Sequence, residues 1–328
     1  MSETVVTVLM PKMDDAERFR IRYRNLEAQL GQLGVRPTFA ESHTSYDPVS
    51  HNFDGHFSSD RQIIDDVSPE NIAVVRDLTI PKNFAKPLYE DEESPQIVND
   101  PALNIFLRNK ANLFNRLPEL HPDTVVVPQE SVISAVSAIC SETVVVKPVE
   151  GMLSRGVYIG PKEDVPSSMA KGDYLVQEYI NTSGGIPELA IKGIHNVRLL
   201  SVNSQILGAV GRIKGSEALL LRDDIYGRVY LPEELPESML AIADIVHREL
   251  TELPGKGKNV IAIDLMRGIN SSGNEVDVIC EVNHRPLRIS EYDLLESQED
   301  PKGIKWLAAQ WDKYEAEMLA NVAQKREN

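Results

Sequence analysis

The sequence predicts an α/β protein built from two or three packed subdomains. A chain of 328 residues is longer than one typical domain core. Its start reads as a strand followed by a helix, and its second half contains four apolar runs that are typical of an antiparallel sheet. Between these parts lies a shorter stretch with the pattern of a small α+β module. These three observations carry the fold class.

The N-terminal part, residues 1–107, is predicted to be one domain. Thr4–Met10 is a β-branched run and indicates a strand. The helix after it ends near Gly34, and its apolar residues recur at helical spacing: Phe19, Tyr23, Leu26, Leu30 and Leu33. Glu41–Arg61 mixes polar residues and glycine without periodicity, which predicts a long loop, and Ile72–Val75 predicts a second strand.

The middle part, residues 108–178, predicts the small α+β module. A helical stripe over Ser131–Cys140 precedes a strand at Thr143–Val146. A glycine-containing loop follows, and Tyr174–Ile180 closes the module as another strand.

The C-terminal part, residues 179–328, predicts the antiparallel sheet and two helices. One helix spans Glu237–Leu250, and an amphipathic helix ends the chain. The four predicted strands are Val197–Val202, Ile206–Val210, Val260–Leu265 and Val276–Val282. The last helix carries its apolar residues at spacings of three and four: Ile304, Leu307, Trp311, Tyr314 and Met318.

Composition and charge exclude several classes of function. Fifty acidic against 34 basic residues give a net charge of −16, which repels nucleic acids and anionic membranes. Cys140 and Cys280 are too few for a disulfide framework, and the first residues lack the pattern of a signal peptide. No apolar run reaches the length of a membrane span. We therefore expect a cytoplasmic protein with no nucleic-acid or membrane partner.

Acidic and amide side chains converge in the last two predicted strands. The period of a strand puts Ile279, Glu281 and Asn283 on one face. If the turn after Asp264 centres between residues 271 and 272, Asp264 pairs opposite Ile279 and becomes a diagonal neighbour of Glu281. A slip of one residue would undo this arrangement.

Two chemical interpretations of these oxygens are open. Three hard oxygen ligands on one face suit Mg²⁺, which takes its other ligands from water and nucleotide phosphate. Acids at alternating strand positions are also the ordinary pattern of a solvated sheet face. The first interpretation implies a nucleotide site, and the second implies no ligand.

The pattern Ile263-Asp264-Leu265 followed by Glu281-Val282-Asn283 resembles the ATP-grasp family. The resemblance extends over about Gln96 to Ser290, and it implies that Asp264, Glu281 and Asn283 ligate one or two Mg²⁺ ions, or Mn²⁺ in their place, between the phosphates of ATP. It also implies a pre-ATP-grasp domain, a small lid and a C-terminal domain over the three ranges given above.

Two lysines and a loop fit the phosphate side of that resemblance. Lys147 closes the strand Val145-Val146-Lys147-Pro148, and Lys110 would be the first of the two phosphate-binding lysines. The loop that closes over the phosphates would contain Ser154, Arg155 and Gly156. A surface lysine followed by an ordinary turn is the alternative for Lys147.

The residues expected to bind adenosine lie in Val176-Gln177-Glu178-Tyr179-Ile180, which is similar to the family's hinge strand. The resemblance implies that Glu178, Tyr179 and Ile180 frame adenine. Glu188 is either a partner for the ribose hydroxyls or a loop acid without a ligand.

Two arginines in strand-like runs are candidates for catalytic residues. By resemblance, Arg198 and Arg212 hold the γ-phosphate and an acyl-phosphate intermediate, and solvated strand arginines are the alternative. Arg285 and Arg288 follow Asn283, where a substrate carboxylate could bind, but the family pattern departs here and gives no acceptor pocket. Histidines around His43–His56 lack the spacing of a zinc site, so no metal is assigned to them.

The resemblance implies an ATP-dependent carboxylate–amine ligase. It would activate a small-molecule or peptide carboxylate as an acyl phosphate, join it to an amine, and release ADP and phosphate. A phosphotransferase on the same fold and a nucleotide-binding regulatory protein are the alternatives, together with a structural sheet protein. Assembly into a homo-oligomer such as a dimer is left open.

Overall fold

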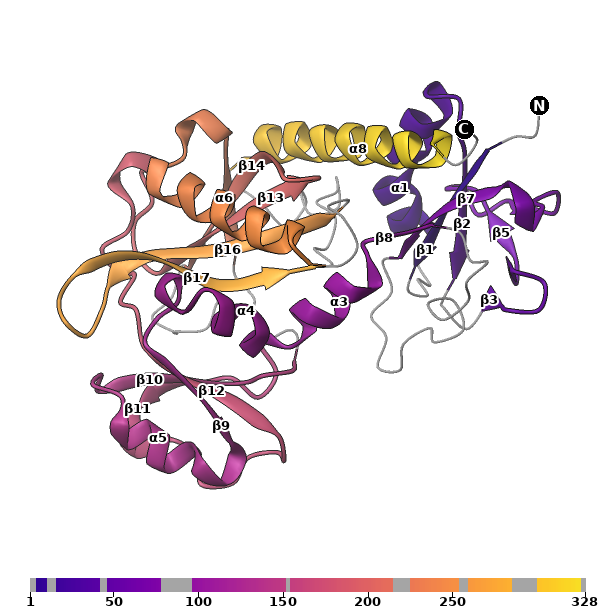
Figure 1. Ribbon diagram of the computed structural model, residues 1–328. Coiled ribbons are helices and arrows are strands. Elements are labelled where there is room, and N and C mark those ends of the chain that lie inside the picture. Colours follow the sequence, from indigo (N-terminus) through magenta and orange to yellow (C-terminus); the bar gives the residue numbers. More distant parts are fainter. Residues whose placement is uncertain are drawn as a thin grey trace.

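The computed structural model describes residues 4–10, 16–41, 46–77, 96–151, 154–214, 225–253, 259–284 and 300–325. It contains an N-terminal sheet, a small four-stranded sheet and a larger five-stranded sheet, as Figure 1 shows. The last helix lies beside the N-terminal domain, where it contacts the first helix of the chain and strands of the N-terminal sheet. The predicted α/β class is confirmed.

The N-terminal sheet has six strands in the order β6-β5-β2-β1-β7-β8. Its centre is parallel: β1 (Val5–Met10) pairs with β2 (Arg36–Glu41) and with β7 (Ile72–Asp77), and β7 pairs with β8 (Gln96–Val98). Helix α1 (Ala16–Gln32) connects β1 to β2, and its predicted apolar stripe is buried from Phe19 to Leu30. Leu33 follows the helix and is 37% exposed, so it does not belong to that stripe.

The predicted long loop Glu41–Arg61 is wrong in part. Three two-residue strands lie within it, namely β3 (Tyr46–Asp47), β4 (Asn52–Phe53) and β5 (His56–Phe57), and β6 (Ile63–Ile64) pairs with β5. A strand of two residues cannot produce a visible period, so no sequence pattern marks it.

The middle of the chain forms the small sheet, in the order β11-β10-β12-β9. Helices α3 (Pro101–Arg108) and α4 (Lys110–Arg116) lead into it, each capped by a side chain, Asp100 and Asn109 respectively. Its strands are antiparallel: β9 (Thr124–Pro128), β10 (Thr143–Pro148), β11 (Tyr158–Pro161) and β12 (Asp173–Glu178). The helix predicted over Ser131–Cys140 is α5 (Val132–Ala138), which packs on this sheet and shares a separate core with it.

The large sheet is antiparallel, in the order β15-β14-β13-β16-β17. Its strands are β13 (His195–Val202), β14 (Gln205–Lys214), β15 (Ile225–Tyr230), β16 (Val260–Ile269) and β17 (Glu275–Asn283). Four of them were predicted. Strand β15 was missed because Gly227 and Arg228 interrupt its short apolar pattern.

The two faces of the large sheet pack against different helices. One face packs with α3, α4 and helix α6 (Glu237–Thr251), and its inward residues include Leu199, Ile263 and Val282. The other face packs under helix α8 (Pro301–Gln324), where Leu200 and Ala262 join the core of the N-terminal domain. Helix α8 also contacts α1 and β7, so it joins the N-terminal domain to the large sheet (Figure 1).

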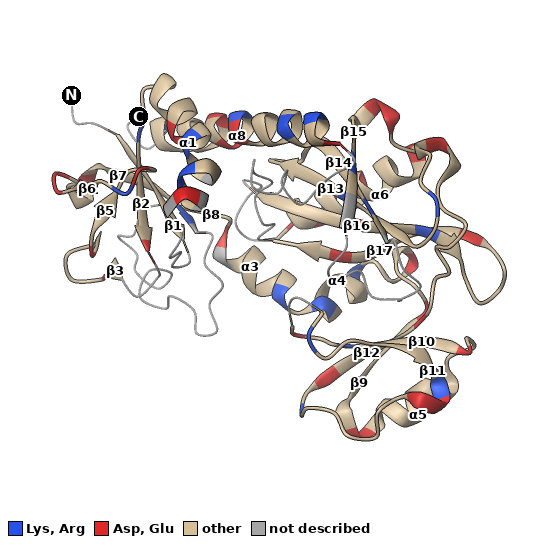
Figure 2. Cartoon of the chain, turned by 180° about the vertical axis from the view of Figure 1, so that it is seen from behind, with Lys and Arg blue, Asp and Glu red and all other residues tan. Residues whose placement is uncertain are grey.

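Helix α8 is long but carries acidic and basic residues along its length (Figure 2). In the described part of the chain, no helix combines the length and the hydrophobicity that a bilayer span requires. The domain boundaries expected at residues 107 and 178 stay a prediction.

Candidate functional site

Charged and amide side chains form a row across four strands of the large sheet. The row consists of Arg212 on β14, Arg198 on β13, Asp264 on β16, and Glu281 with Asn283 on β17. Arg198 and Asp264 are direct cross-strand neighbours, as are Asp264 and Glu281. The row lies on the face that α8 covers farther along the strands, and we call it the polar row.

A β-bulge sets the alignment of the two acids. Leu265 lies opposite Ile279, whereas Asp264 lies opposite Glu281, so Cys280 is one extra residue on β17. Without the bulge Asp264 would lie opposite Cys280, and the two carboxylates would point to opposite faces. The bulge therefore brings the two candidate metal ligands together.

The predicted register of this strand pair is wrong, although the two acids do share a face. Asp264 does not pair opposite Ile279, because the turn centres at residue 272, half a residue beyond the expected position, and the bulge adds a further shift. Ile279 also does not share the face of Glu281, since it is fully buried in the same core as Val282. The displaced turn centre moves the pairing by one residue, and the bulge moves it by another. Glu281 therefore lies opposite Asp264, in the place expected for Ile279, and the two acids lie on the same face.

Asp264 is the centre of the electrostatics of the polar row. Arg198 donates from Nε and Nη2 to its two carboxylate oxygens, both at 2.7 Å. Asn283 donates from Nδ2 to Oδ2 at 3.2 Å, and Arg212 Nη1 lies 3.5 Å from the same oxygen. Only 4% of the Asp264 side chain is exposed, so this charge is stabilised by its partners and not by water.

The two arginines of the row differ in their surroundings. Burial opposes the charge of Arg198, but the attraction and hydrogen bonds of Asp264 outweigh it and raise the pKa of Arg198. Burial, followed by repulsion from Arg198, lowers the pKa of Arg212. The row thus contains one tightly paired cation and a second one held less closely, which an additional anion would stabilise.

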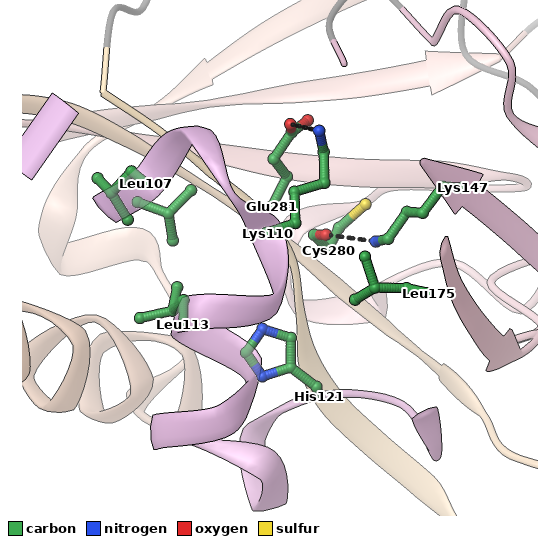
Figure 3. Close-up of a pocket in the computed structure, with 9 residues that line it drawn as sticks. Leu107, Lys110, Leu113, His121, Lys147, Leu175, Cys280 and Glu281 are labelled. Atoms are coloured by element: carbon green, nitrogen blue, oxygen red, sulfur yellow. Dashed lines mark hydrogen bonds and ion pairs between the residues drawn. The ribbon is translucent and has the colours of Figure 1, made fainter. Parts of the chain in front are cut away.

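Two lysines lie beside Cys280 and Glu281 of β17, as Figure 3 shows. Lys110, at the start of α4, places Nζ 2.6 Å from the carbonyl oxygen of Gly151 and 3.4 Å from Oε1 of Glu281. Lys147, at the end of β10, donates from Nζ to the carbonyl of Cys280, the extra residue of the bulge, at 3.1 Å. Burial lowers the pKa of Lys147, so an anion next to it would be favourable.

A pocket opens between α4, the small sheet and β17. It is lined by Leu107, Lys110, Leu113, His121, Lys147, Leu175, Cys280, Glu281 and Val282. Its apolar part and His121 were missed from the sequence, because they come from segments that only the fold brings together. His121 donates from Nδ1 to the carbonyl of Leu117 at 2.8 Å, and burial lowers its pKa to about 4. Its imidazole is therefore neutral at pH 7.

Glu178 ends β12 and joins the small sheet to the large one. Its Oε1 accepts from the backbone N–H of Asp123 at 3.0 Å, and its Oε2 accepts from the N–H of Ser271 at 2.9 Å. Burial opposes ionisation, but these bonds outweigh it and lower the pKa of Glu178. Both oxygens already have partners, so the predicted contact of this carboxylate with adenine competes with two backbone bonds.

The other predicted hinge residues lie next to Glu178. Tyr179 is half-buried, and Ile180 is buried where the chain passes close to Gly268 of β16. A Cβ on Gly268 would come within 2.8 Å of Ile180 Cγ2 and 2.5 Å of the carbonyl oxygen of Asn181. Glycine at position 268 therefore permits the close approach of the hinge segment to the large sheet.

Glu188 is not brought to the polar row. It accepts a hydrogen bond from Nη1 of Arg267 at 2.8 Å, and 58% of its side chain is exposed. Arg267 also contacts Ser238 of α6, so it lies on the sheet face opposite Asp264. This placement favours the second interpretation of Glu188, a loop acid, and its contact with ribose stays a prediction.

The predicted phosphate loop lies in the hairpin between β10 and β11. Ser154 and Gly156 have positive φ angles of 52° and 73°, and Arg155 is exposed. Arg285, Arg288 and His43 lie outside the described residues. His56 is buried and hydrogen-bonds to Thr38 and Asn52, which gives it a structural role.

The donor set of the polar row fits Mg²⁺ bound together with a nucleotide. Nowhere in the described ranges do three or more His, Cys, Asp or Glu side chains cluster as a metal cage would need. Two carboxylates and an amide leave coordination positions for water and phosphate, as Mg²⁺ requires. Lys110, Lys147 and the two arginines add cations of the kind that bind a polyphosphate.

Comparison with known proteins concerns the fold and the family of the chain. The family model of the ATP-grasp domain matches residues 107–288, and no curated protein sequence matches the chain. Similar solved structures include the D-alanyl-alanine synthetase A of Vibrio cholerae (TM-score 0.64, 14% identity, covering 99% of this chain and 100% of the other). The D-alanine–D-alanine ligase of Bacillus anthracis complexed with ATP has a TM-score of 0.60 at 13% identity, over 99% and 100% of the two chains.

A third similar structure is the RimK domain ATP-grasp protein of Sphaerobacter thermophilus. Its TM-score is 0.58 at 16% identity, over 96% of this chain and 99% of that one. At such identities the structures establish a shared fold. The family model covers more than half of the sequence and includes the polar row, the two lysines and the hinge. The chain therefore belongs to the ATP-grasp family.

Proposed function

We propose that this protein is an ATP-dependent ligase that joins a carboxylate to an amine and releases ADP and phosphate. Family membership supports ATP as the nucleotide. Structures of similar fold are named as D-alanine–D-alanine ligases, a D-cycloserine synthetase and the ligase PsnB, which supports ligation as the class of reaction. The observation that carries the proposal is the polar row beside Lys110 and Lys147.

Each residue of the site has a proposed role that follows from its chemistry. Asp264, Glu281 and Asn283 would hold one or two Mg²⁺ ions, with Mn²⁺ as a substitute. Lys110 and Lys147 would contact the phosphates. The phosphate oxygens would replace the backbone carbonyls of Gly151 and Cys280 that these lysines contact in the structure. When bound, ATP would supply the phosphoryl group that activates the substrate carboxylate as an acyl phosphate.

Arg198 is prepared for a developing negative charge. Its guanidinium is fixed by two hydrogen bonds to Asp264, so little reorganisation is needed when an anion forms nearby. Arg212 is less closely paired and would add a second cation on the same face. Closure of the small sheet over the site would exclude water, which otherwise hydrolyses an acyl phosphate.

The proposal is tested by an ADP-release screen over panels of carboxylic acids and amines, including short peptides. A ligase releases ADP rapidly only when a suitable acid and a suitable amine are both present. ADP release with a hydroxyl compound alone, together with a phosphorylated product, would replace the ligase by a phosphotransferase. Tight ATP binding without turnover over the whole panel would support a regulatory protein instead.

A further inference from the structure

Asn99 makes a set of contacts that resembles the pairing of a strand. It follows β8 directly, and its side chain is completely buried. Its Nδ2 donates to the carbonyl of Val260 at 2.8 Å and to the carbonyl of His284, while its Oδ1 accepts from the N–H of Val260 at 2.8 Å. One primary amide therefore satisfies three backbone groups of two different strand ends.

Those strand ends belong to the strands that carry the candidate metal ligands. Val260 is the first residue of β16, four residues before Asp264. His284 comes directly after Asn283, the last residue of β17. The side chain of Asn99 is thus hydrogen-bonded to the residue that follows Asn283. It fixes the end of β17 relative to the start of β16.

Asn99 is itself fixed by a buried ion pair between distant parts of the chain. Arg76 of β7 places Nη1 3.3 Å from Oδ1 of Asn99 and donates from Nε to Oε1 of Glu315 at 2.7 Å. Trp311 of α8 donates from Nε1 to Oε2 of the same Glu315 at 2.8 Å. The side chains of Arg76 and Glu315 are fully buried. A buried pair of this kind gives little net stability, but it requires a defined geometry.

We propose that Asn99 is a positioning residue for the metal site: it fixes Asn283 relative to Asp264 and transmits the position of the N-terminal domain and α8 to that site. This inference rests on the proposed function, because it takes the polar row to be the Mg²⁺ site. The physical reason is that metal affinity requires correctly placed ligands, and outer contacts that orient the ligands contribute strongly to it.

The test is direct metal binding, measured without turnover. Mn²⁺ is titrated into the protein with ADP, and free Mn²⁺ is followed by electron paramagnetic resonance. Asn99→Asp keeps the size of the side chain and an acceptor for the Val260 N–H, but it removes the donor to the two carbonyls. We expect it to weaken Mn²⁺ binding by about 10-fold or more. Binding of ADP in EDTA should stay close to that of the wild type.

Asn104→Ala is the matched control, since Asn104 is also buried and its side chain donates to the backbone carbonyl of Asn99, whereas the side chain of Asn99 bonds to the ends of β16 and β17. Its Mn²⁺ binding should match the wild type. If Asn99→Asp does not fold, Asn99→Ala replaces it, because it adds no charge. Wild-type Mn²⁺ affinity in a folded Asn99 variant, or an equal loss in Asn104→Ala, overturns the inference. Absence of Mn²⁺ binding in the wild-type protein overturns the proposed function instead.

Discussion

Arg198 and Asp264 form a bidentate ion pair across two neighbouring strands, with both nitrogen–oxygen distances at 2.7 Å. The carboxylate is almost completely buried, while a quarter of the arginine side chain is exposed. Removing one partner of such a pair leaves an uncompensated charge in a poorly solvated place. The pair therefore makes the polar row a determinant of stability as well as a candidate for catalysis.

Arg198→Ala is expected to lower the free energy of unfolding by about 2–3 kcal/mol, since buried pairs cost somewhat more to break and this one is partly exposed. Urea unfolding measures the change. The double variant Arg198→Ala with Asp264→Asn should be more stable than Arg198→Ala alone, because it removes the orphaned carboxylate charge as well. A double variant that is less stable than the single one would contradict this account.

Glu281→Gln and Asn283→Ala are expected to abolish ATP turnover, with a loss of about 100-fold or more, because each removes a proposed metal ligand. Both side chains are only partly buried, so the fold should be retained. ADP release and urea unfolding are measured together. Glu275→Gln is the matched control, an exposed acid on the same strand that lies away from the row. Wild-type turnover in both variants would contradict the assignment of these two residues as metal ligands.

Glu178→Ala should weaken the junction between the small and the large sheet. The change leaves the N–H groups of Asp123 and Ser271 without their charged acceptor, which costs about 2 kcal/mol of unfolding free energy. Hydrogen exchange at these two amides should become faster. The control is Glu188→Ala: Glu188 is largely exposed and Arg267 keeps its bonds to Asp277, so the loss should be less than about 1 kcal/mol. Equal effects of the two variants would show that Glu178 has no special role in the junction.

Local periodicity predicted the elements with a clear apolar pattern of their own, whereas β2, β11, β15, α3 and α4 were not predicted. The four long strands of the large sheet and the helices α1, α5, α6 and α8 lie where the sequence placed them. The register of β16 with β17 could not be predicted, because a bulge depends on both strands and leaves no signal in either alone. The prediction that Asp264 and Glu281 share a face was correct, although the strand pairing from which it was derived was wrong.

The site was predictable where its residues belong to short motifs. Lys147 and Glu281 are such residues, and the structure brings them to one pocket. His121 gave no signal, since a single histidine in a polar segment has no pattern to recognise. The partners of Glu178 and Glu188 could not be foreseen either, because backbone N–H groups and Arg267 reach them only through the tertiary fold.

The pH dependence of stability should reflect the buried histidines, among them His56. Burial, with a smaller contribution from the charge of Arg36, lowers the pKa of His56 from 6.5 to about 4. Between these values the unfolded chain binds a proton that the folded protein does not. Stability is therefore fully present above pH 6.5 and is lost as the pH falls toward 4.

For His56 alone, the expected loss between pH 7 and pH 5 is about 2 kcal/mol of unfolding free energy. Urea unfolding at the two pH values measures it, and His56→Gln, which keeps polar atoms near Thr38 and Asn52, should make the dependence shallower by that amount. His121 has a similarly low pKa, so part of the acid sensitivity should persist in the variant. An unchanged pH profile in His56→Gln would mean that His56 takes up its proton at the same pH in the folded and the unfolded chain, and that burial does not lower its pKa.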